Sequence, residues 1–162
     1  MKTFAVSLVI SVLLAILTPA VATSDPSMPP RPSSRPPVRP DASELRRASE
    51  LFLLTREENR RLRWDQCLAQ KAFIRAKQLV VQGYFEHHDP TTGKNPAWEL
   101  VRRCYACRSA GENLAKGMDR PERIHQALMN SPTHRKNILD RRFQRLGIGC
   151  YDYVCVELFA GF

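Results

Sequence analysis

Two histidines and one glutamate are the side chains best suited to chemistry in this sequence. His87 follows the segment Gly-Tyr-Phe-Glu, Glu112 follows a glycine, and His134 follows Ser-Pro-Thr. His134 falls in the first turn of an expected helix, where the positive end of the helix favours a neutral imidazole. Neutral imidazoles and a carboxylate suit a zinc ion with an open fourth position, so these three residues are candidate metal ligands.

Neighbouring polar residues extend this candidate site. Asn113 follows the glutamate, and Ser131 is expected to cap the helix that carries His134. A Ser131–His134 nucleophile pair is disfavoured, because a capping serine uses its oxygen on the backbone. His87 and His88 are adjacent in the chain, and an extended chain turns neighbouring side chains in opposite directions. Only one of these two histidines is therefore expected to face the site.

Two long helices are expected ahead of these residues. Asp41 and Glu44 have the spacing of a capping box, which opens a helix with an apolar stripe and an arginine-rich outer face. A second helix is expected from about Asp65 to Gln82, with apolar residues at helical spacing. Gly83 ends it, since glycine readily adopts the left-handed conformation found at helix termini.

Shorter elements follow. Residues 83–95 are rich in turn residues and read as a loop, and Pro96 opens a short helix. Residues 111–117 are expected to form an ordered connection with one short helical turn at most. Residues 119–122 have the spacing of a second capping box, which opens the next helix. Ser131 then caps a last short helix.

The pattern changes near the C-terminus, where apolar residues alternate in LGIGCYDYVCVELF. Two paired strands are expected there, joined by a two-residue turn at Asp152-Tyr153. Helices therefore flank a small, mostly antiparallel sheet. The expected fold class is α+β, with layers of helix packed against sheet.

The N-terminal part of the chain differs in composition from the rest. Residues 1–22 combine a basic start, an apolar run and small residues, so we expect a signal peptide cleaved near Ala22 and a secreted product. Residues 23–43 read as a Pro/Arg-rich linker that cannot bury a core. Residues 44–162 are then the single folded domain.

The formal net charge is +9 at pH 7. Such a charge favours contact with anionic lipid surfaces or with anionic polymers of the cell envelope. The sequence has neither an RNA-binding signature nor a recognition helix, so nucleic acid is not an expected partner.

Five cysteines in an exported protein predict a disulfide framework with one thiol left over. Cys150 and Cys155 lie opposite each other across the expected turn, which favours a cross-strand disulfide. Cys104 and Cys107 fit a small-loop disulfide, with a redox pair or half of a zinc clip as alternatives. Cys67 is then the expected free, buried thiol.

The blocks GYFEHHDP, GENLAKG, NSPTHRKNIL and LGIGC resemble, in order and spacing, the bacterial branch of the CAP superfamily. This superfamily, also called the SCP-domain family, includes cysteine-rich secretory proteins, antigen five and pathogenesis-related proteins. The resemblance covers residues 44–162 and implies an α-β-α sandwich. It also implies a cavity lined by His87, Glu112 and His134, where some members bind divalent metal.

Three positions depart from the family pattern. Ser131 aligns with the second acidic residue of eukaryotic members, so that acid is missing. Leu128 replaces a tryptophan that is usual in bacterial relatives. Glu157 replaces a common glutamine, and it either adds an acid near the site or faces solvent on its strand.

These observations favour a secreted CAP domain that binds a ligand, with an enzyme as the less favoured reading. The expected partners are a small hydrophobic ligand, such as a lipid or a sterol-like molecule, or a peptide, and the expected state is a monomer. The first alternative is a hydrolase in which zinc at His87, Glu112 and His134 activates water. The second is an envelope protein that binds anionic surfaces by charge. Fold alone does not decide between them, since the family lacks a single agreed activity.

Overall fold

Residues 39–162 are described by a computed structural model. The expected signal peptide, residues 1–22, and most of the expected linker, residues 23–43, lie outside that range. No helix within it is long and apolar enough to cross a membrane. The elements, in chain order, are α1 Ala42–Glu58, β1 Arg63–Trp64, α2 Gln66–Gln82, α3 Pro96–Arg102, β2 Ser109–Lys116, α4 Pro121–Asn130, α5 Pro132–Leu139, β3 Arg145–Tyr151 and β4 Val154–Gly161.

Both long helices begin where their local signals predict, and α2 also ends where its signal predicts, whereas α1 ends at Glu58, before the Leu62 that its apolar stripe included. Asp41 accepts hydrogen bonds from the backbone N–H groups of Ser43 and Glu44, and Glu44 accepts one from Asp41, so the capping box of α1 is confirmed. Asp65 caps α2 by accepting from the backbone of the third residue of the helix. Gly83 ends α2 in the left-handed conformation, with φ of 72°.

Two local predictions are wrong. Residues 111–117 belong largely to strand β2 and contain no helical turn, because the chain there pairs with β4 along its whole length. Glu112 and Asn113 are adjacent polar residues, so the sequence of β2 does not show the alternation of apolar and polar residues by which a strand is usually predicted. The capping box at residues 119–122 is also absent, since Arg120 is the N-cap of α4 and makes no side-chain cap bond.

The sheet has the strand order β1-β3-β4-β2. β3 and β4 form the predicted hairpin, β2 pairs antiparallel with β4, and only β1 runs parallel to its neighbour β3. The sheet is therefore mostly antiparallel, as predicted. β2 is one of its two edges, which becomes important for the site.

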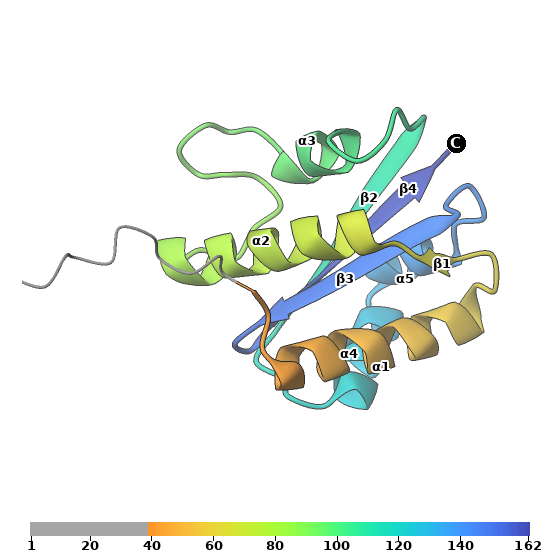
Figure 1. Ribbon diagram of the computed structural model, residues 1–162, viewed down its shortest axis with the longest axis horizontal. Coiled ribbons are helices and arrows are strands. Elements are labelled where there is room, and N and C mark those ends of the chain that lie inside the picture. The colour runs from red at the N-terminus through yellow and green to blue at the C-terminus, as the bar shows by residue number, and fades with distance from the viewer. Residues whose placement is uncertain (1–38) are drawn as a thin grey trace, which may run out of the picture. The chain divides into compact units, whose positions relative to one another are not determined.

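Helices cover both faces of this sheet, which makes the fold the predicted α-β-α sandwich. Figure 1 shows α2 and α3 over one face and α1, α4 and α5 over the other. The side chains of β4 alternate between the two layers. Val156 and Leu158 pack in the core under α2 and α3, while Cys155 and Phe159 pack in the core with α1, α4 and α5.

Two glycines let α2 lie directly on β3. A Cβ atom at Gly147 would overlap the backbone of Leu68 and Ala69, and one at Gly149 would overlap the backbone of Phe73. Helix and strand therefore approach more closely here than side chains would allow. The LGIG segment thus fixes the position of α2, which carries part of the site.

The disulfides correct one prediction and confirm another. Cys150 and Cys155 are paired across the hairpin, as predicted. Cys67 pairs with Cys104, and Cys107 is the free cysteine. The predicted Cys104–Cys107 bridge and the free Cys67 are therefore wrong, because helix packing brings the start of α2 to the end of α3.

Candidate functional site

The candidate site is built on the edge strand β2. Successive residues of a strand point to opposite faces, so Glu112 and Asn113 enter different layers. Glu112 meets residues of α2 and of the loop that follows it, whereas Asn113 meets α5 and β4. The sequence neighbours that we grouped into one site therefore serve the two faces of the sheet.

Glu112 forms a buried ion pair that also holds His87. Its Oε2 accepts from Arg75 Nε at 3.2 Å, and its Oε1 lies 2.8 Å from His87 Nδ1. The side chains of Arg75 and Glu112 are 0% and 2% exposed, while that of His87 is 39% exposed. Since a carboxylate can only accept, Nδ1 of His87 carries the hydrogen, and Nε2 is the acceptor of the neutral ring.

Arg75 is the residue that sequence reasoning missed. It lies three positions after Ala72 and four before Leu79, inside the apolar stripe of α2. Its guanidinium donates to Tyr84 Oη at 2.6 Å and to the backbone carbonyl of Glu86 at 2.7 Å. An arginine within an apolar stripe was the available signal, because a buried charge requires a partner. Arg75 thus fixes both the carboxylate and the loop that carries His87.

His134 approaches the site from the other layer. It lies in the first turn of α5, and its ring centroid is 6.3 Å from that of His87, with the two planes tilted by 55°. Burial, and to a smaller extent the nearby His87, lowers the pKa of His134. The neutral imidazole that we predicted is therefore favoured. The two rings meet although their elements cover opposite faces of the sheet.

The predicted metal-ligand set does not have a ligating arrangement. Within residues 39–162, no group of three His, Cys, Asp or Glu side chains could hold a metal ion. Both oxygens of Glu112 are engaged, one by Arg75 and one by His87. Ligation by Glu112 would therefore have to replace at least one of these two contacts. The arrangement of these side chains therefore does not support zinc chemistry at this site.

Asn113 and Glu157 form a second buried polar group, on the far side of β2. Glu157 is 1% exposed, and its carboxyl oxygens lie 2.8 Å from Thr55 Oγ1 and 2.9 Å from Asn113 Nδ2. Asn113 also donates to the backbone carbonyl of His134 at 3.2 Å. Burial raises the pKa of Glu157 to about 7, although both hydrogen bonds act to lower it. Glu157 therefore does not face solvent, and its carboxyl group lies between Thr55 of α1 and the candidate site residue Asn113.

The remaining predicted residues lie around this centre. His88 is exposed, as predicted. Ser131 is the N-cap of α5 but makes no side-chain cap bond, so our reason for dismissing its hydroxyl is wrong. No hydrogen bond within the described residues joins that hydroxyl to His134, His87 or Glu112. Leu128 is 2% exposed and belongs to the core with α1.

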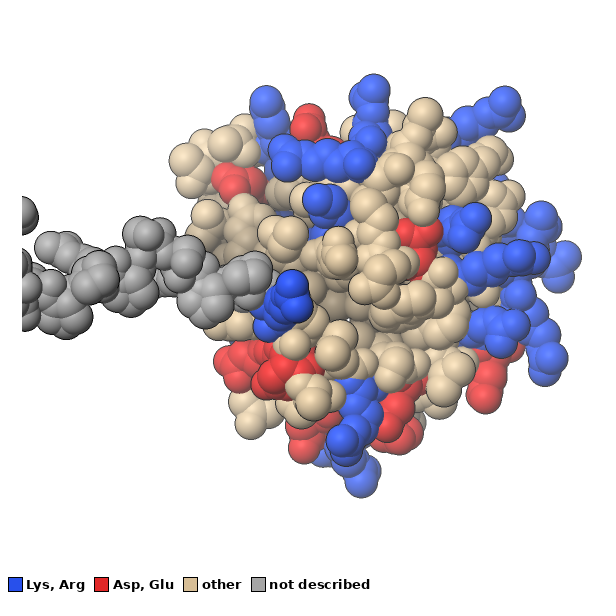
Figure 2. Space-filling view, in the orientation of Figure 1, with Lys and Arg blue, Asp and Glu red and all other residues tan. Residues whose placement is uncertain are grey.

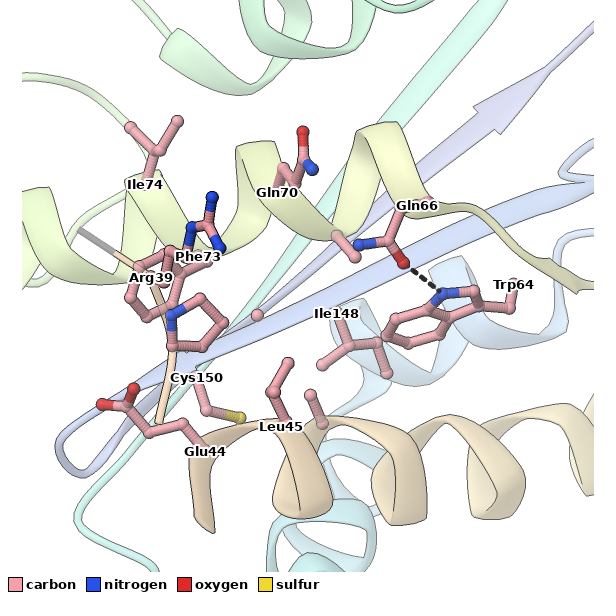
Figure 3. A pocket seen from close by; sticks show the side chains of 14 residues that line it. Arg39, Glu44, Leu45, Trp64, Gln66, Gln70, Phe73, Ile74, Ile148 and Cys150 are labelled. Atoms are coloured by element: carbon pink, nitrogen blue, oxygen red, sulfur yellow. Dashed lines mark hydrogen bonds between the residues drawn. The ribbon is translucent and has the colours of Figure 1, made fainter. Parts of the chain in front are cut away.

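Two hollows lie elsewhere on the domain. A groove of about 510 Å³ runs between α1 and α2 above β3, and its rim includes Leu45 and Ile74 (Figure 3). A second hollow, of about 500 Å³, is lined by apolar residues together with Tyr84, Phe85 and Lys116. His87, Glu112 and His134 line neither hollow. The second one adjoins the site through Tyr84, whose hydroxyl accepts from Arg75.

Comparison with known proteins gives one family. A family model described as the cysteine-rich secretory protein family (CAP) matches residues 45–156. The Bacillus subtilis protein YkwD, described as uncharacterized, is 38% identical over 88 residues, or 54% of this chain and 34% of that protein. The chain therefore spans only about a third of that relative.

Solved structures of similar fold agree with this family assignment. An extracellular protein containing a SCP domain, from Bacillus anthracis, matches with a TM-score of 0.67 and 30% identity, over 78% of this chain and 45% of that one. An outer surface protein of Borrelia burgdorferi matches with a TM-score of 0.61 and 22% identity, over 76% of this chain and 96% of that one. At that identity the second match speaks for the fold alone.

Proposed function

The chain belongs to the cysteine-rich secretory protein family, and from this membership we propose that it is a secreted, monomeric binding module. Secretion agrees with the signal peptide expected at residues 1–22 and with two disulfides, which persist in oxidising compartments. The Bacillus anthracis relative is described as extracellular. The proposed ligand is a small amphipathic molecule with an apolar body and a polar head, such as a lipid or a sterol-like compound; a peptide is the alternative ligand.

The observation that carries this proposal is an apolar hollow beside a fixed polar cluster. The hollow, of about 500 Å³, includes Leu79, Val80 and Phe85 in its lining. Its wall residue Tyr84 is hydrogen-bonded to Arg75, which in turn holds Glu112 and thereby His87. Ligand sites typically combine an apolar pocket with a few oriented polar groups. The apolar body would occupy the hollow, and the polar head would bond to His87.

The test is ligand binding by purified protein. Organic extraction and mass spectrometry would identify a co-purified lipid, and titration with a fluorescent fatty acid would measure saturable uptake. His87→Ala should weaken binding about tenfold, because a hydrogen bond to a polar head contributes on the order of 1.5 kcal/mol. Val80→Glu should abolish it, since a charge would enter the apolar hollow.

The matched control is His88→Ala, which removes the exposed neighbouring ring. It should leave the affinity unchanged within twofold. An equal loss of affinity in the His87 and His88 variants would show that the polar cluster is not part of the binding site. The absence of any saturable uptake by the unmodified protein would refute the proposal itself.

One observation favours a hydrolase as the second candidate. The contact between His87 Nδ1 and Glu112 Oε1, at 2.8 Å, orients an imidazole as general bases require. In that function His87 Nε2 would accept a proton from water that attacks an ester or amide. Hydrolysis of a panel of activated esters should then fall at least a hundredfold in His87→Gln, in line with the usual contribution of a general base. Equal rates in both proteins would exclude this candidate.

A further inference from the structure

Six arginines come together at one end of the domain from two segments that are far apart in the sequence. The connection between α1 and β1, with β1 itself, supplies Arg60, Arg61 and Arg63. The connection between α5 and β3, with the start of β3, supplies Arg141, Arg142 and Arg145. We call this surface the arginine end. Figure 2 shows basic side chains gathered on the right of the domain, where β1 lies in Figure 1.

The two segments form one ordered surface. Arg63 and Arg145 are direct partners in the parallel pairing of β1 with β3, and the backbone N–H of Arg63 donates to Gln144 at 3.0 Å. Asn59 Nδ2 adds bonds to the backbone carbonyls of Ile138 and Asp140. The guanidinium groups are therefore presented by connected backbone, so little backbone ordering is left to occur on binding.

Apolar residues between the arginines hold both segments to the core. Leu62 is 0% exposed and Phe143 is 3% exposed. The arginines at positions 60, 61, 63, 141 and 142 are all exposed, and Arg145 is half-buried. Each segment thus buries its apolar residue and turns its charges outward.

Within residues 39–162, two acidic side chains contact these arginines. Asp140 lies in the second segment and takes three contacts from Arg142, the shortest at 2.6 Å. Asp65 is buried, accepts from Tyr105 Oη at 2.6 Å and lies 4.0 Å from Arg145. Within residues 39–162, no ion pair engages the other four arginines: Arg60, Arg61, Arg63 and Arg141.

The chemistry of the surface selects an anionic partner with repeated oxyanion groups. All six charges are guanidinium groups, whose planar donor fork matches phosphate and carboxylate geometry. Several closely spaced charges act together on a polyanion, since each neutralised phosphate releases counterions. A membrane surface fits less well, because Leu62 and Phe143 are buried and unable to insert.

We propose that the arginine end binds a linear poly(polyol phosphate), in which phosphodiester groups join polyol units that carry no nucleobase. This interaction is separate from the ligand site around His87 and goes beyond the function proposed above. It gives the domain an attachment to a polyanionic matrix, independent of what the ligand site binds. The unpaired arginines of both segments contact successive phosphates along the polymer.

The test compares two variants with equal loss of charge. Arg60, Arg61 and Arg141 are changed together to Gln in the first variant. Arg46, Arg120 and Arg123, which are exposed on α1 and at the start of α4, are changed together to Gln in the control. Binding to poly(glycerol phosphate) is measured by calorimetry from 50 to 300 mM salt, after circular dichroism has shown that both variants fold.

The first variant should bind at least tenfold more weakly at low salt. Its slope of log K against log salt should be smaller by roughly two, as expected when about three phosphate contacts are lost. The control should stay within threefold of the unmodified protein. Equal weakening in both variants would overturn the proposal, because net charge alone would then explain binding.

Two further arms identify the polymer. Polyglutamate with the same number of charges should bind at least tenfold more weakly than poly(glycerol phosphate). Vesicles containing 30% phosphatidylglycerol should bind more weakly than the polymer at equal phosphate. Equal or tighter binding to either probe would overturn the assignment to a phosphodiester polymer. His87→Ala should leave polymer binding unchanged, so failure of this proposal is distinct from failure of the ligand site.

Discussion

Glu157 keeps a carboxyl group in the interior of the domain without a cation beside it. Its partners are the hydroxyl of Thr55 and the amide of Asn113. With its pKa raised to about 7 by burial, the folded protein holds this proton more tightly than the unfolded chain does. The resulting stabilisation is complete below pH 4.5, the ordinary value, and is lost as the pH rises through about 7.

The variant Glu157→Gln tests this titration. An amide keeps the shape and both hydrogen bonds of the protonated carboxyl, but it does not ionise. In the unmodified protein, this group should lower the free energy of unfolding by on the order of 3 kcal/mol between pH 4.5 and pH 7.5. Urea unfolding across that range should show this decrease in the unmodified protein and not in the variant.

His134 provides the internal control for that measurement. Because its pKa is lowered, its contribution has the opposite sign: stability is present above the ordinary pKa of histidine and is lost on acidification. Glu157→Gln leaves this part of the profile in place. The same pH dependence in both proteins would show that Glu157 is ionised throughout.

At the scale of the helices and strands, the local signals at the two long helices were correct, the local signal at residues 119–122 was not, and the strand and the disulfide that depend on long-range contacts were missed. The capping box at Asp41 and the terminator Gly83 act within one turn, so the sequence predicts them directly. The strand containing Glu112 exists because it pairs with β4, more than forty residues later. Cys67 pairs with Cys104 because α2 packs beside α3. The spacing of the cysteines in the sequence does not reveal this packing.

Gly149 tests how closely α2 must approach β3. Gly149→Ala should cost more than 3 kcal/mol of stability, because its Cβ would overlap the backbone of Phe73 and the helix would have to move. The control Gly117→Ala has open space around it and a φ of 82°, so it should cost only about 1–2 kcal/mol. Thermal unfolding of both variants measures the difference. Equal losses of stability in the two variants would mean that α2 can move away from β3 at little cost.

The cysteine pairing makes a second prediction at this scale. Thiol counting on the denatured, unreduced protein should give one free thiol, and mass mapping should place it at Cys107. Joint replacement of Cys67 and Cys104 by Ala should cost about 4 kcal/mol, the value expected for a closed loop of this length. Cys107→Ala should change stability by less than about 0.5 kcal/mol. A free thiol at Cys67 would contradict the pairing.

At the scale of the whole domain, the site depends on both helical layers. The resemblance to the family predicted that His87, Glu112 and His134 would converge, and the structure brings the rings of the two histidines within 6.3 Å. The same resemblance says nothing of Arg75, because that position lies outside the matched motifs. The sequence gives a net charge of +9, and the fold gathers six arginines where β1 meets β3. The net charge of a sequence does not say where the charged side chains lie in space, so only the fold shows that these arginines are clustered.

The disulfide between Cys67 and Cys104 closes a covalent ring across 37 positions of the chain. The ring contains α2, the loop after it, and α3, so Arg75 and His87 both belong to it. A protease that cuts the exposed loop between Gly83 and Asn95 would leave both fragments covalently joined and still packed on the sheet. The ring therefore makes the site tolerant of a single cut that would release part of an unbridged chain.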